Sequence, residues 1–247
     1  MSAYAGFAAY YDTLMDDFDY PAWAEYYMKL IAPSGKITNL CDCACGTGSL
    51  TIEFAKRIQR VTGVDLSANM LEIAQEKARR AGVRAMFVRE DMTKLALPKP
   101  VDAIVCGCDG VNYCTTDASV SAFFQRVHAS LRPGGMFAFD ISSAYKLAQV
   151  LGDNFFGEER EDIAYLWQNR FDSEKQTVQM NLTFFARESD GRYRKFSETH
   201  VQRAHDPQNL AQMLRACGFT DIQIYGDRTL AAPTEKELRI HFSARRD

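Results

Sequence analysis

The stretch at residues 39–50 constrains the fold more than any other part of this chain. It reads as a short apolar run that ends in a turn containing Gly46 and Gly48, and apolar residues at helical spacing follow it. Glycine has no Cβ, so the chain can turn sharply there and a ligand can lie against main-chain N–H groups. A strand, a glycine turn and a helix in this order predict a binding site for a nucleotide-like ligand.

A second apolar run, at residues 60–65, ends in Asp65. A carboxylate at this position can accept hydrogen bonds from both hydroxyls of a ribose. The dinucleotide fingerprint G-x-G-x-x-G requires a third glycine, and that position holds Thr51. Thr51 at this position counts against a nicotinamide cofactor. At this point two alternative interpretations remain: an NAD(P)-dependent oxidoreductase, and a strand-loop-helix turn that binds no ligand.

The form D-x-A-C-G-T-G, from Asp42 to Gly48, resembles motif I of the class I S-adenosylmethionine-dependent methyltransferases. The resemblance extends over most of the chain. It implies S-adenosylmethionine as the cofactor and an α/β fold with a Rossmann-like, seven-stranded, doubly wound sheet. In that family the acidic residue at the Asp42 position helps to orient the loop and the methionine end of the cofactor. Within the family, the chain resembles bacterial small-molecule enzymes such as sugar N-methyltransferases and glycine N-methyltransferase.

The bulk composition excludes several classes of partner. The 247 residues allow one elaborated domain, and the net charge of -3 gives no strong attraction to a polyanion, so nucleic acid is not expected. No apolar run is long enough to span a membrane, and the beginning of the chain shows no signal-peptide pattern. We therefore expect a cytoplasmic protein that acts on a small-molecule substrate.

Seven cysteines, an odd count, include the alternating set Cys41, Cys43 and Cys45. Their spacing does not match the C-x-x-C pattern of metal sites. We interpret them as small buried thiols in a reducing compartment and expect no metal.

Residues 1–34 are rich in aromatic side chains at helical spacing, and they predict an N-terminal helical lid. The sequence around Tyr11 resembles the N-terminal "YD" segment of small-molecule methyltransferases, in which a tyrosine closes over the sulfonium or the methionine carboxylate. Tyr11 is thus a candidate for cofactor binding and catalysis, and Trp23 is a second candidate for cofactor binding. The alternative is a pair of amphipathic helices that only pack on the next domain.

Residues 35–141 read as alternating strands and helices, and residues 206–247 return to the same cofactor-binding domain. After the third strand, the resemblance implies that Asp91 accepts a hydrogen bond from the adenine amino group and that Met92 packs on the ring. The cofactor site expected in this way comprises Tyr11, Trp23, Asp42, Ala44, Gly46, Thr47, Gly48, Asp65, Leu66, Met70, Asp91, Met92 and Cys108.

The loop at residues 107–113 follows the fourth strand. Ligands of doubly wound sheets bind at the carboxyl ends of strands, near the point where the strand order reverses, so this loop should border the transferable methyl group. It lacks the (D/N/S)-P-P-(Y/F) pattern of nucleic-acid amino-methyltransferases. Tyr113 and Asp109 are candidates for taking a proton from the acceptor. Packing at a helix entry is the alternative role for Asn112 and Tyr113.

Residues 142–205 break the alternation of strands and helices. Three extended runs, at residues 163–167, 177–185 and 193–202, are separated by turn signals. They predict a small antiparallel β insertion over the active site, and such a sheet is also compatible with a homodimer.

The predicted function is methyl transfer to an N or O nucleophile of a small molecule by in-line displacement. Positioning and exclusion of water suffice for a methyl group on a sulfonium, and no catalytic triad is present in the sequence. A non-catalytic S-adenosylmethionine-binding or scaffold protein on the same fold is the main alternative.

Overall fold

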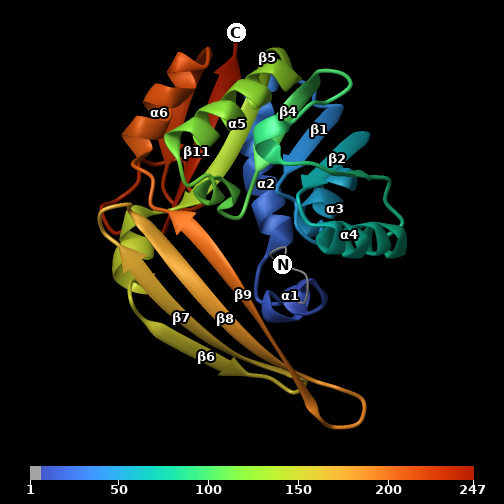
Figure 1. Cartoon of the computed structure of the whole chain (residues 1–247). Coiled ribbons are helices and arrows are strands. Elements are labelled where there is room, and N and C mark those ends of the chain that lie inside the picture. Colours follow the sequence, from blue (N-terminus) through green and yellow to red (C-terminus); the bar gives the residue numbers. More distant parts are fainter. Residues whose placement is uncertain (1–6) are drawn as a thin grey trace.

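The computed structural model describes residues 7–247, which form two β-sheets with helices around the larger one (Figure 1). The larger sheet has seven strands in the order β10-β11-β5-β4-β1-β2-β3. Its strands are parallel except for β11, which runs antiparallel to both of its neighbours. The strands are β1 (Asn39–Cys43), β2 (Arg60–Asp65), β3 (Met86–Arg89), β4 (Val101–Cys106), β5 (Leu131–Ser142), β10 (Phe219–Tyr225) and β11 (Arg239–Arg246). The seven-stranded, doubly wound sheet predicted from the sequence is confirmed.

Two hydrophobic clusters cover the two faces of this sheet. On one face, α5 (Asp117–Ser130) and α6 (Pro207–Ala216) pack against β4, β5 and β11. On the other face, α2 (Tyr20–Ile31) and α3 (Ser49–Ala55) pack against β1, β4 and β5. Central strands buried on both faces read as continuous apolar runs, which is why β1 and β4 were recognisable in the sequence.

The remaining helices lie around this core. The helix α4 (Ala68–Arg80) contacts β2, β3 and α3, and its N-cap Ser67 accepts a hydrogen bond from the Met70 N–H. Three 3₁₀ turns complete the domain: η1 (Ala32–Ser34), η2 (Met92–Lys94) and η3 (Gly110–Tyr113). No helix within residues 7–247 is both long and apolar enough to cross a membrane.

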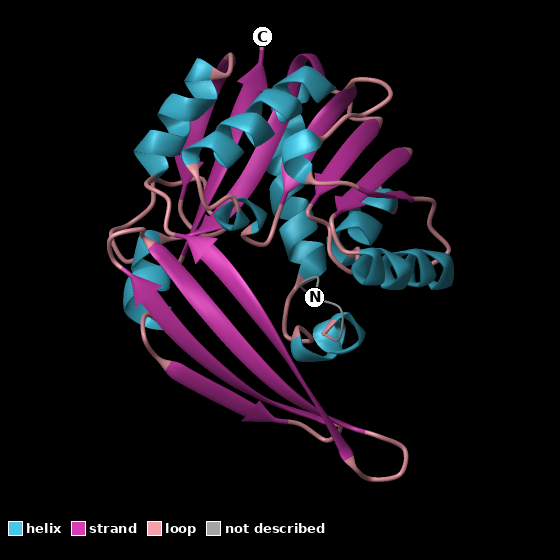
Figure 2. Ribbon diagram, in the orientation of Figure 1, coloured by secondary structure: helices cyan, strands magenta, loops and turns pink. Residues whose placement is uncertain are grey.

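The smaller sheet is antiparallel and has the strand order β6-β7-β8-β9 (Figure 2). It comprises β6 (Phe155–Glu159), β7 (Ile163–Asp172), β8 (Thr177–Arg187) and β9 (Tyr193–Arg203), and it follows a π-helical segment, η4 (Lys146–Leu151). The inserted sheet predicted after the fifth strand is present. Its first strand was missed because Gly157 reads as a loop signal, and η4 was not predicted.

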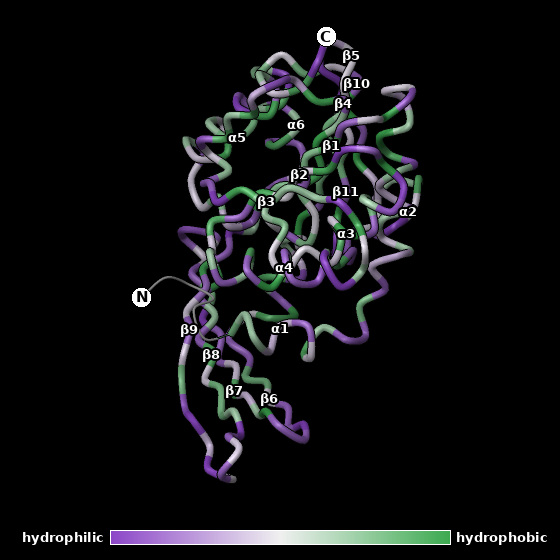
Figure 3. Tube along the Cα trace, turned by 90° about the vertical axis from the view of Figure 1, so that its right-hand side faces the viewer, coloured by the Kyte–Doolittle hydropathy of each residue, from purple (hydrophilic) through white to green (hydrophobic). Residues whose placement is uncertain are grey.

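The helix α1 (Ala8–Leu14) lies between the smaller sheet and α4 in both views (Figures 1 and 3). The Phe7 ring stacks on Phe184 of β8 at 4.8 Å, and the Tyr10 ring stacks on Phe196 of β9 at 6.1 Å. The second predicted lid helix, α2, instead packs in the core of the larger domain. Its apolar stripe is wide enough to be buried against the sheet. Of the two helices, α1 therefore remains the candidate for the predicted lid, and we call it the lid helix below. Residues 1–6 of the predicted lid lie outside the described residues.

Candidate active site

A cavity of about 700 Å³ lies at the carboxyl ends of β1, β2 and β4. Ligands of doubly wound sheets bind at this edge. The cavity brings together most of the candidates from the sequence: Tyr11, Asp42, Ala44, Gly46, Thr47, Asp65, Leu66, Met70, Asp91, Met92, Cys108 and Tyr113. Gly48, Trp23 and Asp109 do not line it.

The glycine turn has a left-handed backbone at three positions, with φ of 54° at Ala44, 54° at Gly46 and 73° at Gly48. A Cβ at Gly46 would meet no atom within 4 Å, so the backbone faces open space there. A Cβ at Gly48 would lie 2.8 Å from the Cβ of Ala74 in α4. Gly48 therefore lets the turn pack on α4, whereas Gly46 leaves room for a ligand to approach the main chain.

Asp42, at the end of β1, is buried at the floor of the cavity. Its Oδ2 accepts a hydrogen bond of 2.6 Å from the Thr51 hydroxyl. Burial raises the pKa of Asp42 to about 7, because the Thr51 hydrogen bond offsets only part of the desolvation and the nearby Asp65 adds to it. Thr51 stands where the dinucleotide fingerprint has its third glycine, and the structure gives it this partner.

Asp65, at the end of β2, holds the loops on both sides of it. Its Oδ2 accepts the Gly46 N–H at 2.8 Å, and its Oδ1 accepts the Ser67 N–H at 2.8 Å. Burial raises the pKa of Asp65, and these backbone hydrogen bonds oppose the rise. The neighbouring Leu66 is 65% exposed and lies at the cavity rim, so a ligand would find a carboxylate and an apolar side chain next to each other.

Asp91 and Met92 lie at the start of η2 on the cavity wall. The Asp91 Oδ1 accepts hydrogen bonds from the backbone N–H of Thr93 at 2.9 Å and from its hydroxyl at 2.8 Å. Met92 packs against the apolar cluster between the sheet and α5. These contacts fix the Asp91 carboxylate and pack the Met92 side chain on the cavity wall.

Three tyrosines from three elements also line the cavity: Tyr11 from α1, Tyr20 from α2 and Tyr113 from η3. Burial raises the pKa of Tyr11 well above its ordinary value, with a further contribution from Cys108, and burial likewise raises the pKa of Tyr20. Tyr20 was not predicted. Its place before Pro21, at the start of a helix, was the available signal.

The lid helix is fastened to the glycine turn by polar contacts. The Thr47 hydroxyl donates to Asp12 Oδ1 at 2.7 Å, and Lys77 Nζ of α4 lies 2.6 Å from Asp12 Oδ2. Lys77 also donates to the Ser49 hydroxyl at 2.5 Å. Asp12 therefore links α1 to the loop that follows β1.

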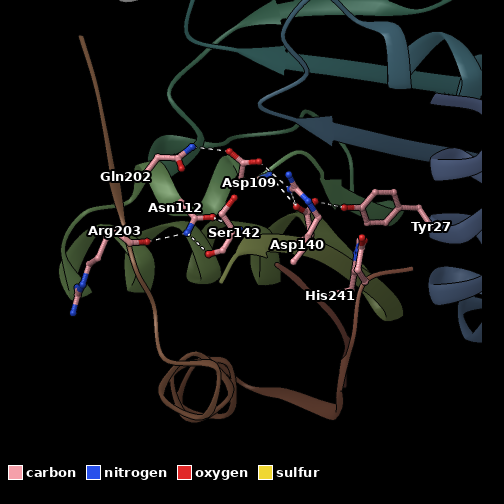
Figure 4. Close-up of polar contacts among 10 residues, drawn as sticks. Tyr27, Asp109, Asn112, Asp140, Ser142, Gln202, Arg203 and His241 are labelled. Carbon is pink, nitrogen blue, oxygen red and sulfur yellow. Dashed lines mark hydrogen bonds and ion pairs between the residues drawn. The ribbon is translucent and has the colours of Figure 1, made fainter. Parts of the chain in front are cut away.

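Asp109 lies behind the cavity wall. Its carboxylate is 2.9 Å from the Arg239 guanidinium and accepts a 2.6 Å hydrogen bond from Gln202 of β9 (Figure 4). Its backbone N–H donates to Asp140. Burial disfavours ionisation of Asp140, but Arg239, His241 and the Tyr27 hydroxyl together outweigh that effect and lower the pKa of Asp140. The prediction of Asp109 as a proton acceptor is not supported, since an arginine neutralises it outside the cavity.

Asn112 is fully buried and joins three elements (Figure 4). Its side-chain amide donates to the carbonyls of Ser142 in β5 and Arg203 in β9, and its Oδ1 accepts the Ser142 N–H. These contacts agree with the alternative role expected for Asn112, which is packing.

Trp23 is buried and does not line the cavity. Its ring packs 4.7 Å from Phe18 and 5.3 Å from His241, and the Arg239 guanidinium lies 5.1 Å above it. The prediction that Trp23 contacts the cofactor is therefore corrected. The aromatic stripe of α2 faces the sheet, and only Tyr20 at its start reaches the cavity.

Comparison with known proteins agrees with this geometry. A family model described as a methyltransferase domain matches residues 40–135. A protein of Geobacillus sp. (strain WCH70) named as a methyltransferase is 36% identical over 98% of this chain and 99% of its own length. The chain is a class I S-adenosylmethionine-dependent methyltransferase. A solved structure of an S-adenosylmethionine-dependent methyltransferase from Clostridium acetobutylicum ATCC 824 is 30% identical to it, with a TM-score of 0.89 over 98% of each chain.

A second solved structure, the sugar N-methyltransferase KedS8 from Streptoalloteichus sp ATCC 53650, has a TM-score of 0.77 over 96% of this methyltransferase and 93% of its own chain. At 19% identity this likeness shows the fold alone. The cofactor of the methyltransferase is S-adenosylmethionine, and the cavity fits it. The main chain at Gly46 is open to a ligand that lies against the glycine turn. The carboxylate of Asp65 suits the ribose of the cofactor, and the apolar rim at Leu66 suits its adenine.

Proposed function

We propose that this methyltransferase transfers a methyl group to an amine or hydroxyl of a small molecule by in-line displacement. The observation that carries the proposal is that Tyr11, Tyr20 and Tyr113, which come from three different elements, line the same cavity as the candidate cofactor residues. A volume of about 700 Å³ lies in the usual range for small-molecule sites. A cavity walled in this way suits a compact acceptor better than a macromolecule.

The charge of the lining supports the same conclusion. Of the described residues that line the cavity, four are carboxylates and one is an arginine: Asp42, Asp65, Glu90, Asp91 and Arg89. Nucleic-acid sites instead carry clustered lysines and arginines that neutralise phosphates. Among the described residues of the lining there is therefore no cluster of cations that could bind a phosphate backbone.

S-adenosylmethionine supplies a methyl group already activated by its attachment to a sulfonium. The protein must therefore hold the acceptor in line and exclude water, which can lower the barrier by roughly 7–11 kcal/mol. The phenols of Tyr11 and Tyr20 are protonated near neutral pH, and burial raises their pKa values further, so they can act as hydrogen-bond donors toward the acceptor. The proposed cofactor contacts are those of Asp42, Ala44, Gly46, Thr47, Asp65, Leu66, Met70, Asp91, Met92, Cys108 and Tyr11.

A methyl-transfer screen tests the acceptor class. Small amines, amino sugars, hydroxylated sugars and carboxylic acids would be incubated with the protein and S-adenosylmethionine, and S-adenosylhomocysteine release would be measured. Amino sugars come first, because a structural relative is a sugar N-methyltransferase. Release that depends on a small amine or hydroxyl compound supports the proposal. Release only with protein or nucleic acid, from a protein that binds the cofactor in calorimetry, overturns it.

A further inference from the structure

Three polar residues alternate along β9 on the face that points toward the larger domain: Glu198, His200 and Gln202. Each is less than a tenth exposed. Burying such groups is unfavourable unless they have partners, and each contacts a different part of the cavity region. Glu198 accepts the Phe7 N–H at the start of α1 at 3.0 Å, His200 meets Tyr113, and Gln202 donates to Asp109.

His200 lies between a cavity residue and a carboxylate. Its Nδ1 is 3.5 Å from the hydroxyl oxygen of Tyr113, and its Nε2 is 3.5 Å from Glu198 Oε2. Tyr113 lines the cavity and is 37% exposed, so its hydroxyl can reach a ligand. Catalytic hydrogen bonds are often long in ligand-free structures and tighten when the substrate is bound.

We propose that Tyr113, His200 and Glu198 form a proton relay that takes the proton released by the acceptor. This inference rests on the proposed function, since it concerns the proton that an amine or hydroxyl loses on methylation. Tyr113 is the catalytic residue, because it faces the acceptor. His200 and Glu198 are positioning residues that act through Tyr113.

The step balances as follows. A lone pair of the acceptor forms the new bond to the methyl carbon, the carbon–sulfur bond breaks, and its electron pair stays on sulfur. The acceptor proton passes to the Tyr113 oxygen while the phenolic proton passes to His200 Nδ1. Tyr113 is thereby restored, and the His200 imidazolium lies next to the Glu198 carboxylate.

The role of Glu198 follows from the two ring nitrogens. His200 can accept a proton at Nδ1 only if its single proton is on Nε2 beforehand. A carboxylate cannot donate, so Glu198 favours the tautomer with the proton on Nε2. A glutamine at this position can donate to Nε2 and so allows the opposite tautomer. It also keeps an oxygen for the Phe7 N–H.

The first experiment reads this tautomer without any acceptor. The chain has four histidines, so ¹⁵N-histidine labelling of the full-length protein gives a small spectrum, which H200Q assigns. We expect wild-type His200 to carry its proton on Nε2 and E198Q to move part of it to Nδ1. A wild-type proton on Nδ1, or an unchanged tautomer in E198Q, overturns the relay. Because this experiment needs no acceptor, it tests the relay even if the acceptor screen fails.

The second experiment uses an acceptor found by the screen. Y113F and H200Q should each lower kcat by about 100-fold, the usual contribution of general acid–base catalysis, with cofactor affinity unchanged in calorimetry. The double variant should be no slower than either single one, because both remove one relay. H128Q, on the distant helix α5, is the matched control and should keep wild-type kcat. Multiplying effects in the double variant, or single variants with wild-type kcat, overturn the proposal.

Discussion

The side chain of Thr51 alters the chemistry of the buried carboxyl of Asp42. Its hydroxyl donates the one side-chain hydrogen bond described for Asp42, and it does so from inside α3. Burial nevertheless dominates and keeps the pKa of Asp42 near 7. The carboxyl is therefore half-protonated close to neutral pH, which makes its ionisation measurable through stability.

D42N should remove a pH dependence from the free energy of unfolding. Between the ordinary value of 3.8 and about 7, the folded protein holds a proton on Asp42 that the unfolded chain has lost. Stability therefore falls as pH rises through this window, by up to about 1.4 kcal/mol per pH unit from this group. Urea unfolding of wild type and D42N across the window measures the difference. Parallel pH profiles for the two proteins would show that Asp42 titrates normally.

Asp65 should dominate the affinity for S-adenosylmethionine. D65A should weaken cofactor binding by about 1–3 kcal/mol, the cost of losing a charged hydrogen-bond acceptor. Part of that loss comes from the loop, because Asp65 also accepts the Gly46 and Ser67 N–H groups. Isothermal titration calorimetry measures it, with E72A on the exposed face of α4 as the control. Equal affinity in D65A and wild type would remove Asp65 from the site.

At the scale of elements, the short helix α1 depends on its contacts with its neighbours. It has seven residues, too few to be stable alone. Aromatic stacking on β8 and β9 holds one side, and the contacts of Asp12 with Thr47 and Lys77 hold the other. The lid helix is thus ordered by the two surfaces between which it lies.

K77A should speed release of the cofactor. The contact between Lys77 and Asp12 is partly exposed, so we expect an effect of about 1 kcal/mol or less, seen as up to a roughly fivefold faster dissociation rate. Stopped-flow displacement measures this rate. R79A removes an exposed ion pair from the same helix and should leave the rate unchanged. A K77A rate equal to wild type would show that the pair does not hold the lid closed.

Helices, strands and turns could be predicted where the residues that determine them are close together in the sequence. The glycine turn is such a case, since its backbone angles, its cap and its helix all arise within residues 39–55. The position of α2 could not be predicted, because an aromatic stripe at helical spacing suits a lid and a core helix equally well. Packing of Tyr27 against Phe54 and the sheet places α2 in the core.

Across the whole molecule, the two sheets are joined through the loop after β4. Asn112 bonds to β5 and β9, and Asp109 bonds to Gln202 of β9. None of these partners could be identified from the sequence, because some 30 to 93 residues separate them along the chain. The same holds for His200, which has no local motif around it. Most residues that line the cavity could therefore be predicted, and the contacts between the two sheets could not.

N112A should lower the free energy of unfolding by about 2–4 kcal/mol, because it removes three hydrogen bonds and leaves buried backbone groups without a partner. Urea unfolding measures the loss. The exposed Asn209 provides the control, and N209A should change stability by less than about 0.5 kcal/mol. A loss in N112A as small as in N209A would show that this bridge does not hold the sheets together.

The location of α1 has a kinetic consequence. One short helix touches both the loop after β1, through Thr47, and the smaller sheet, through its aromatic side chains. If both products leave past this helix, its detachment sets a ceiling on turnover. If that ceiling is reached, kcat will fall as solvent viscosity rises, and substrates that differ in intrinsic reactivity will turn over at similar speeds.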